Sequence, residues 1–403
     1  MLAALLLQSG FQFAGETGGK GEYIVYVGTY TRGEESRGPS AKSDGIYAYR
    51  FQPATGKTVR LGLAARTENP SFLVVHPNHR FLYAVNEVSD YTDPRPSSVN
   101  AFSIDDEITG YAGQGSISSF SVDVGTGKLT VLNTVSSRGA GPCHLSLGKS
   151  GNWLMVANYD SGSIAGFPVK DDGELGDATG FMQHRGSSVD RERQQEPHAH
   201  CILPSPDNHF ALVADLGLDE ILVYRVDAAK GTYAPNDPPF TKVAPGSGPR
   251  HLAFHPNGRF LYEISEMKPA VTAFAYDSSR GSLAELQTMQ LLPEGSKERG
   301  SGAEVEVHPS GRFLYGSIRG LNSIAVLAID GKGTLELLEY VPTQGSTPRH
   351  FAIDPTGAYL FVENQESDNI VLFRIDQRTG RLIPTGTVLD VPTPVCIAFL
   401  SAN

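Results

Sequence analysis

One sequence motif recurs seven times along this chain, and its successive copies start 72, 55, 52, 53, 46 and 46 residues apart. The clearest copy runs from Pro249 to Glu266 and reads PRHLAFHPNGRFLYEISE. The other copies begin at Pro70, Pro142, Pro197, Gly302, Pro348 and Pro394. A unit repeated at such spacing is typical of a propeller or a solenoid. The repetition therefore favours one domain, although a length of 403 residues alone suggests two or three.

Each repeat has the pattern of four strands. In the clearest copy, period-two alternation predicts strands over His251–Phe254, Phe260–Ser265, Ala270–Tyr276 and Leu283–Leu291. Turn-forming residues separate them, and the whole chain contains 44 Gly and 26 Pro. We expect an all-β fold, a seven-bladed β-propeller with four antiparallel strands in each blade.

The two ends of the chain are expected to share one blade. The last copy, from Pro394, supplies only a first strand, while Tyr23–Thr29, Gly45–Phe51 and a segment near Val59–Ala64 supply the other three. Such sharing closes the ring and removes two exposed sheet edges. The propeller domain is predicted over residues 22–403, with residues 1–21 as a lead-in or the remnant of a signal peptide.

The apolar start of the chain bears on its compartment. Met1–Leu7 is apolar, has no basic flank and is too short to span a membrane. We expect a cytoplasmic protein, with export to the periplasm as the alternative.

Charge and cysteine content narrow the possible partners. A net charge of −11 disfavours nucleic acid and anionic membranes, and it requires a local cationic cluster for any anionic ligand. Cys143, Cys201 and Cys396 form no C-x-x-C pair and each lies in a predicted first strand, so we expect small buried side chains. No cofactor is expected, and the oligomeric state is left open.

The long connections between predicted strands all fall at one end of the propeller. Thr31–Asp44 and Ser89–Gly115 join second and third strands, whereas Gly180–Glu196 and Pro293–Gly300 join one blade to the next. In an antiparallel blade these positions share the end where strand one starts and strand two finishes. Long loops on a compact scaffold commonly carry function, so the site is expected on this face, here called the mouth.

Aligning the repeats predicts a ring of polar side chains at the mouth. The residues aligned at the start of strand one are Phe72, His144, His200, His251, Glu304, His350 and Cys396. Arg250 and Arg349 directly precede two of them, and Glu266 and Arg319 follow the ends of second strands. The repeat from Pro197 carries one extra residue, which leaves His198 as an alternative to His200. A second interpretation is that these histidines only satisfy backbone groups or water in the central channel.

A metal site is the chemical alternative for this ring. Imidazole and carboxylate ligands suit Zn²⁺ or Mn²⁺, but the arginines nearby compete for the same carboxylates, so no metal is predicted. The segment Arg185–Glu196 is either a solvated loop or a loop that folds over the mouth and presents Arg191 or Arg193 to an anion. His76, His255 and His308 fall in turns at the opposite end, where a structural role is expected.

Three segments carry a resemblance to a known family. They are Tyr26–Thr31 (YVGTYT), Gly248–Glu266 and Glu304–Arg319. From Tyr23 to Leu400 the chain resembles the seven-bladed cytosolic 6-phosphogluconolactonases, a family related to fungal carboxy-cis,cis-muconate cyclases. One departure is Ile318, which stands where the family typically has asparagine within Ser-Asn-Arg.

The resemblance implies hydrolysis of a sugar 1,5-lactone, in particular 6-phospho-D-glucono-1,5-lactone of the pentose phosphate pathway. Glu266 or His200 is the expected base, and Arg319 and Arg250 are expected to stabilise the oxyanion or the phosphate. The candidates for binding the substrate are His144, His251, Glu304, His350, Arg349 and His198. The chain has no Gly-x-Ser-x-Gly nucleophile motif. The alternatives are a muconate-type lactonising enzyme and a non-catalytic propeller that binds a small anion or a protein.

Overall fold

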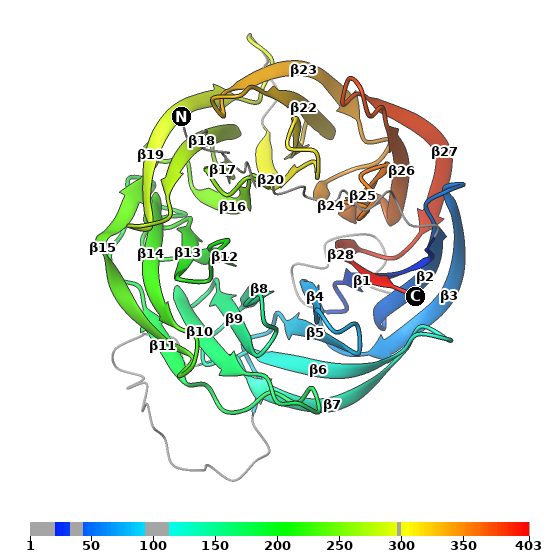
Figure 1. The fold of residues 1–403 in the computed structure, drawn as a ribbon, viewed down its shortest axis with the longest axis horizontal. Coiled ribbons are helices and arrows are strands. Elements are labelled where there is room, and N and C mark those ends of the chain that lie inside the picture. The colour runs from blue at the N-terminus through cyan, green and yellow to red at the C-terminus, as the bar shows by residue number, and fades with distance from the viewer. Residues whose placement is uncertain (1–20, 33–42, 93–112, 296–299, 403) are drawn as a thin grey trace, which may run out of the picture.

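The computed structural model describes residues 21–32, 43–92, 113–295 and 300–402. These residues form seven four-stranded antiparallel sheets arranged around a central axis, as the sequence predicts (Figure 1). Most of the lead-in expected over residues 1–21, and parts of three long connections, lie outside the described residues. Within the described part of the chain, no helix has the length and apolar character needed to cross a bilayer.

The strands follow one another outward from the axis in every blade, with the first strand of each repeat innermost. The first complete blade contains β4 (Leu73–Val75), β5 (Phe81–Asn86), β6 (Ser116–Asp123) and β7 (Lys128–Ser136). The second contains β8 (Pro142–Leu147), β9 (Trp153–Asn158), β10 (Ser163–Pro168) and β11 (Gly180–Gln183). The third contains β12 (Ala199–Pro204), β13 (Phe210–Asp215), β14 (Glu220–Asp227) and β15 (Thr232–Lys242). The fourth contains β16 (Pro249–Phe254), β17 (Phe260–Ser265), β18 (Ala270–Asp277) and β19 (Ser282–Gln290). The fifth contains β20 (Ser301–Val307), β21 (Phe313–Arg319), β22 (Ser323–Ile329) and β23 (Leu335–Pro342). The sixth contains β24 (Pro348–Ile353), β25 (Tyr359–Asn364), the short helix η1 (Gln365–Ser367), β26 (Asn369–Ile375) and β27 (Leu382–Asp390).

The seventh blade contains both ends of the propeller. Its sheet order is β28–β1–β2–β3, where β1 is Tyr23–Thr29, β2 is Gly45–Gln52, β3 is Lys57–Arg66 and β28 is Pro394–Ser401. Tyr23 pairs with Ser401 and Val27 with Ile397. The predicted closure is therefore confirmed.

One predicted connection is wrong in extent. Gly180–Glu196 was expected to be a single loop between blades, but Gly180–Gln183 pairs with Ser163–Gly166 as the outer strand β11. The segment is short and lacks clear alternation, so only its pairing with β10 identifies it as a strand. The connection between these blades consists of residues 184–198.

Repeated polar contacts connect three of the blades to the blade that follows each of them. A buried tyrosine in the second strand donates its hydroxyl to a glycine carbonyl of the following blade in the pairs Tyr83–Gly173, Tyr262–Gly333 and Tyr315–Gly380. Those glycines have positive φ, and a β-carbon there would clash with a phenylalanine ring of the preceding blade. The turn histidines contact the next blade through the pairs His76–Gly151, His255–Gly311 and His308–Gly357. Their predicted structural role agrees with these contacts.

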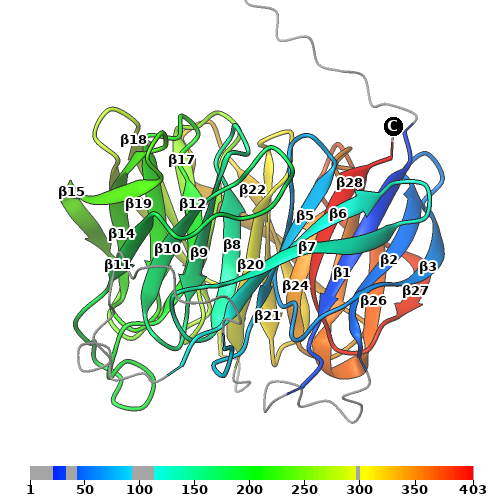
Figure 2. The ribbon, with the colours of Figure 1, turned by 90° about the horizontal axis from the view of Figure 1, so that it is seen from below.

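The orientation of the strands places the mouth on one face of the disc. β28 ends at the upper face in Figure 2, so the starts of the first strands and the ends of the second strands lie at the lower face.

Candidate active site

The first strands of six blades contain a β-bulge near the mouth. In β16, for example, Pro249 pairs with Ser265 and His251 with Ile264, which leaves Arg250 unpaired between them. The residues in the six bulges are Cys143, His200, Arg250, Ala303, Arg349 and Val395. A bulge redirects a side chain, and it separates these residues from the ring of side chains one position further along the strands.

The register corrects the position predicted for His200. Ala199 pairs with Asp215 and Cys201 with Ala214, so Cys201 occupies the position equivalent to His144 and His251. His200 is the bulge residue and lines the pocket at the mouth. Ala199 takes the position of Pro142 and Pro249, so this repeat carries two extra residues, whereas the sequence alignment counted one. His198, the alternative, lies before β12 and stacks on Tyr159, with ring centroids 4.5 Å apart.

The ring of side chains beyond the bulges fills the central channel instead of opening at the mouth. The Phe72 ring lies 4.2 Å from that of His144 and 5.7 Å from that of His350, measured between centroids. The rings of His144 and His251 are 5.4 Å apart. Burial lowers the pKa of all three histidines, most strongly for His144 and His251, so they are neutral at physiological pH.

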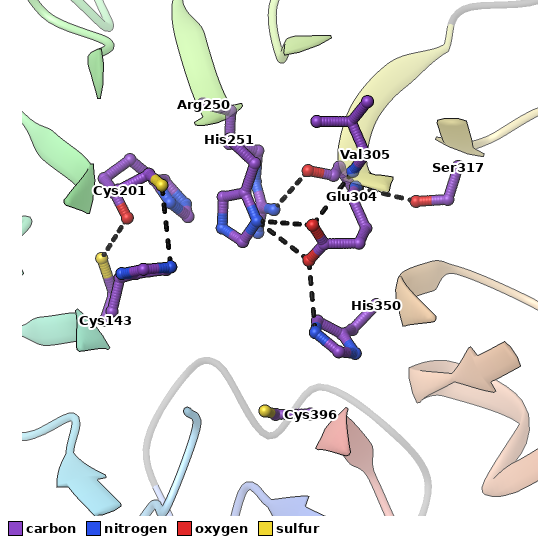
Figure 3. Close-up of polar contacts among 12 residues, drawn as sticks. Cys143, Cys201, Arg250, His251, Glu304, Val305, Ser317, His350 and Cys396 are labelled. Carbon is purple, nitrogen blue, oxygen red and sulfur yellow. Dashed lines mark hydrogen bonds and ion pairs between the residues drawn. The ribbon is translucent and has the colours of Figure 1, made fainter. Parts of the chain in front are cut away.

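Two carboxylates connect His251 and His350 in one series of contacts across neighbouring blades. His251 Nδ1 lies 3.0 Å from Glu304 Oε1, and His350 Nε2 lies 3.3 Å from Glu304 Oε2 (Figure 3). His350 Nδ1 lies 2.6 Å from Glu363 Oε2. Burial raises the pKa of Glu304 and, more strongly, of Glu363.

A pocket of about 480 Å³ opens at the mouth, above the series of contacts between these histidines and carboxylates. It is lined mainly by charged and polar residues: Glu87, Tyr159, Arg193, His200, Glu266, Arg319, Thr347, Arg349, Gln365 and Glu366, with Cys143. Of the predicted catalytic residues, His200, Glu266 and Arg319 line this pocket, and Arg349 is the predicted binding residue that does so. His144, His251, Glu304, His350 and His198 do not line it.

Three arginines converge on the carboxylate of Glu266. Arg250 Nε lies 3.0 Å and Arg319 Nη2 2.9 Å from Oε2, while Arg193 Nη2 lies 2.8 Å from Oε1. Burial opposes ionisation of Glu266, but Arg319, Arg250 and Arg193 hold its pKa well below the usual range. Within this cluster one negative charge thus faces three positive charges, and Glu87 and Glu366 add two further carboxylates to the pocket lining.

The connection 184–198 positions Arg193 over the mouth. Gln194 is fully buried and donates from Nε2 to Leu216 O and Asp219 Oδ1, both at 2.8 Å. Ser188 Oγ donates to Asp219 Oδ2 at 2.5 Å. These contacts favour the folded-over loop among the two alternatives for this segment. The exposed Arg191 does not line the pocket.

Several pocket residues were not among the predicted site residues, although they share a sequence position with two that were. Glu87, Tyr159 and Gln365 occupy the position just after strand two that also holds Glu266 and Arg319. That shared position was the available signal. Tyr30 had no such signal, yet its hydroxyl donates to Glu87 Oε2 at 2.9 Å and the Arg349 guanidinium lies 5.1 Å from the centre of its ring.

A metal site was the chemical alternative for the ring of polar side chains at the mouth. Among the residues that the structure describes, no group of three or more His, Cys, Asp and Glu side chains is placed to hold a metal ion.

The fold is that of the seven-bladed β-propeller lactonases. The chain belongs to the seven-bladed β-propeller lactonase family, whose model matches residues 24–399. The chain is 33% identical over 380 residues to a Bacillus subtilis (strain 168) protein named 6-phosphogluconolactonase, a match covering 94% of this chain and 99% of that protein. A Formosa agariphila protein of the same name is 34% identical over 364 residues, covering 89% of this chain and 94% of its own length. The expected family is therefore confirmed.

Two solved structures share the fold. A putative 6-phosphogluconolactonase from Bacteroides fragilis is 35% identical with a TM-score of 0.81, covering 94% of this chain and 98% of that chain. The periplasmic gluconolactonase of Pseudomonas aeruginosa is 33% identical with a TM-score of 0.82, covering 95% and 100%. Two relatives of nearly equal similarity are thus named for different lactones, one with a phosphate group and one without it.

Proposed function

We propose that this protein hydrolyses a sugar 1,5-lactone and that 6-phospho-D-glucono-1,5-lactone is its main substrate. The single observation that carries the proposal is the convergence of Arg193, Arg250 and Arg319 on Glu266 beside the pocket. A guanidinium has five donors in a planar fork, so an arginine bound to a carboxylate keeps other donors for a second anion. Relatives named 6-phosphogluconolactonase support the phosphorylated lactone.

The positions of the arginines suggest a division of roles. Arg193 and Arg319 line the pocket and would bind the phosphate, whose dianion pairs well with planar forks. Arg349 lines both the pocket and a smaller cavity beneath it, which Arg250 also lines. Arg349 and Arg250 would therefore stabilise the oxyanion that forms when water attacks the lactone carbonyl.

Glu266 is poorly suited to act as the base that the sequence suggested. Its two carboxylate oxygens lie 2.8 to 3.0 Å from nitrogens of Arg193, Arg250 and Arg319, so both are occupied by guanidinium donors and neither is available to a water proton. We assign it the role of holding the arginines in place. His200 lines the pocket, but its buried Nδ1 has no hydrogen-bond partner to orient the ring.

The test is the hydrolysis of freshly prepared 6-phosphogluconolactone beside unphosphorylated gluconolactone, each with and without EDTA. We expect fast turnover of the phosphorylated lactone, slower turnover of the other, and no effect of the chelator. Equal turnover of both lactones would remove the phosphate-binding role. Turnover of neither would overturn the proposal and favour a binding propeller or a muconate-type enzyme. Inhibition by EDTA would show that a metal is required.

The compartment is a separate prediction. The cytoplasm remains our expectation, with export as the alternative, and a relative named as periplasmic supports that alternative. Fractionation of cells that express the full chain distinguishes the two.

A further inference from the structure

A small cavity lies between the pocket and the channel histidines. Its volume is about 10 Å³, roughly the space that one water molecule needs. Cys143, His200 and Arg349 line both this cavity and the pocket, so the two adjoin. Arg250, His251 and His350 also line the cavity. A water held there would meet guanidinium and imidazole groups on one side and the substrate on the other.

The histidines near the cavity are the candidates for taking a proton from this water. They differ in the partners of their two ring nitrogens. His350 Nδ1 pairs with Glu363 Oε2 at 2.6 Å, and its Nε2 lies 3.3 Å from Glu304 Oε2 without a hydrogen bond, so each nitrogen lies beside a carboxylate oxygen. His144 Nδ1 accepts from Ile202 N, and its Nε2 lies 3.6 Å from Cys201 Sγ. His200 has an unpartnered, buried Nδ1 and therefore no group that fixes its tautomer.

His251 alone among these histidines combines an oriented ring with an available nitrogen. Its Nδ1 lies 3.0 and 2.9 Å from the two oxygens of Glu304. Glu304 is itself fixed, because Oε1 accepts from Val305 N at 3.0 Å and its own backbone N–H donates to Ser317 Oγ at 2.9 Å (Figure 3). No residue in the described part of the chain hydrogen-bonds to His251 Nε2.

We propose that His251 is the general base of this lactonase and that Glu304 is the residue that positions it. The proposal rests on the proposed function and deepens it. With Nδ1–H donating to Glu304, the basic lone pair is on Nε2, which is the arrangement by which a carboxylate orients a catalytic imidazole. Arg250 and Arg349 at the same cavity stabilise the hydroxide character that develops on the water.

The reaction balances with water as the only co-reactant. As the water oxygen bonds to the lactone carbonyl carbon, one of its O–H bonds breaks and the proton passes to His251 Nε2. The tetrahedral oxyanion then collapses and the bond from the carbonyl carbon to the ring oxygen breaks. The departing ring oxygen takes the proton back from the imidazolium, which yields the open hydroxy acid and neutral His251.

The experiment compares His251→Gln with His184→Gln in the full chain, using the lactone that the wild-type enzyme turns over. His184 is a matched control because its Nδ1 lies 2.6 Å from Asp215 Oδ2, both side chains are fully buried, and it lines neither cavity. We expect His251→Gln to lower kcat by about 100-fold or more, the usual range for loss of a general base. Its Kd for 6-phosphogluconate, measured by calorimetry, should stay within about threefold of the wild-type value, and His184→Gln should keep kcat within about threefold.

Glu304→Gln tests the positioning role separately. We expect kcat to fall by about tenfold or more with KM little changed. The acid limb of the kcat–pH profile should also move to lower pH, because removing the negative charge beside the imidazole makes protonation harder. A merely structural loss would lower the amount of folded enzyme without moving that limb.

The outcomes separate this inference from the proposed function. If the wild-type protein hydrolyses no lactone, the proposed function fails. If the wild-type protein is active and His251→Gln keeps its kcat, or only His200→Gln abolishes it, the inference alone is overturned. If His251→Gln does not fold, two other measurements test the role of His251: the kcat–pH profile of Glu304→Gln and the solvent isotope effect on wild-type kcat. An effect near 1 or an unmoved acid limb overturns the inference, whereas an effect of about 2 with a moved limb supports it.

Discussion

Arg193 Nη2 lies 2.8 Å from Glu266 Oε1, although the two residues are 73 positions apart in the sequence. Arg193 lies in the connection that leads into the blade β12–β15, whereas Glu266 belongs to the next blade, β16–β19. The same nitrogen lies 3.0 Å from the hydroxyl of Tyr159, which follows β9 of the preceding blade. One side chain thus contacts groups from the blades on both sides of β12–β15. The position of the proposed phosphate-binding group therefore depends on how three blades pack together.

Removal of Arg193 should change the preference between lactones. A lost charge-assisted hydrogen bond to phosphate is worth about 1.5–3 kcal/mol, so Arg193→Gln is expected to raise KM for the phosphorylated lactone by about 10- to 100-fold. KM for the unphosphorylated lactone should change little. Arg191→Gln is the control, since Arg191 is exposed on the same connection and does not line the pocket. A similar rise for both lactones would show that Arg193 has no selective contact with phosphate.

Neutralising Glu266 should destabilise the fold as well as the site. In Glu266→Gln the buried Arg250 loses its counter-charge, and such a loss typically costs about 3–5 kcal/mol. We expect a clear fall in the urea midpoint together with weaker catalysis. Glu192→Gln, an exposed carboxylate on the connection that holds Arg193, should leave the midpoint within error. Equal midpoints for the two variants would contradict the anchoring role.

Glu263 should make stability fall as pH rises. It lies buried in β17, where burial raises its pKa to about 8, against an unfolded value of about 4.3. At a pH between the unfolded and the folded pKa, Glu263 is ionised in the unfolded chain but keeps its proton in the folded protein. The free energy of unfolding therefore falls as the pH rises, by at most about 1.4 kcal/mol per pH unit. The effect is absent below the unfolded pKa and levels off above about pH 8.

Comparison with Glu263→Gln isolates that contribution. Gln cannot ionise, so its stability relative to the wild type should increase from pH 5 to pH 8, as measured by urea unfolding at each pH. Parallel curves for the two proteins would show that Glu263 does not retain its proton in the fold.

The tyrosine contacts between blades should contribute to stability. Tyr262→Phe removes the 3.2 Å hydrogen bond to Gly333 O and leaves a buried carbonyl without that donor, which is expected to cost about 1–2 kcal/mol. Tyr26→Phe is the control, because the buried Tyr26 hydroxyl has no hydrogen-bond partner among the described residues. Thermal unfolding should show a lower Tm for Tyr262→Phe than for Tyr26→Phe, and the reverse order would exclude the contact as a stabilising one.

The architecture could be predicted from sequence because each repeat carries its own evidence. Alternation within Phe260–Ser265 and the turn at His255–Gly258 report a local pattern, and seven copies of that pattern agree with one another. β11 was missed because Gly180–Gln183 is short and its strand character depends on pairing with β10. Local evidence cannot reveal an element that only its neighbour defines.

The site was predicted less well because its geometry depends on single-residue shifts. A bulge turns one side chain toward the pocket and the next into the channel. The repeat from Pro197 carries two extra residues and the alignment counted only one, so His200 was predicted at the position that Cys201 occupies. The role that we propose for Glu266 differs from the expected one for another reason. Its proton affinity depends on Arg193 and Arg319, which come from other blades and whose distances no sequence pattern reports.

The order of the strands also has a consequence for biosynthesis. β28 lies innermost in its blade but follows all the other strands along the chain, and it contributes Val395 to the small cavity. A ribosome therefore produces six full blades and three strands of the seventh before the ring can close. Until β28 pairs with β1, the seventh sheet has an unpaired inner edge, so the ring closes only when the last strand of the propeller is in place.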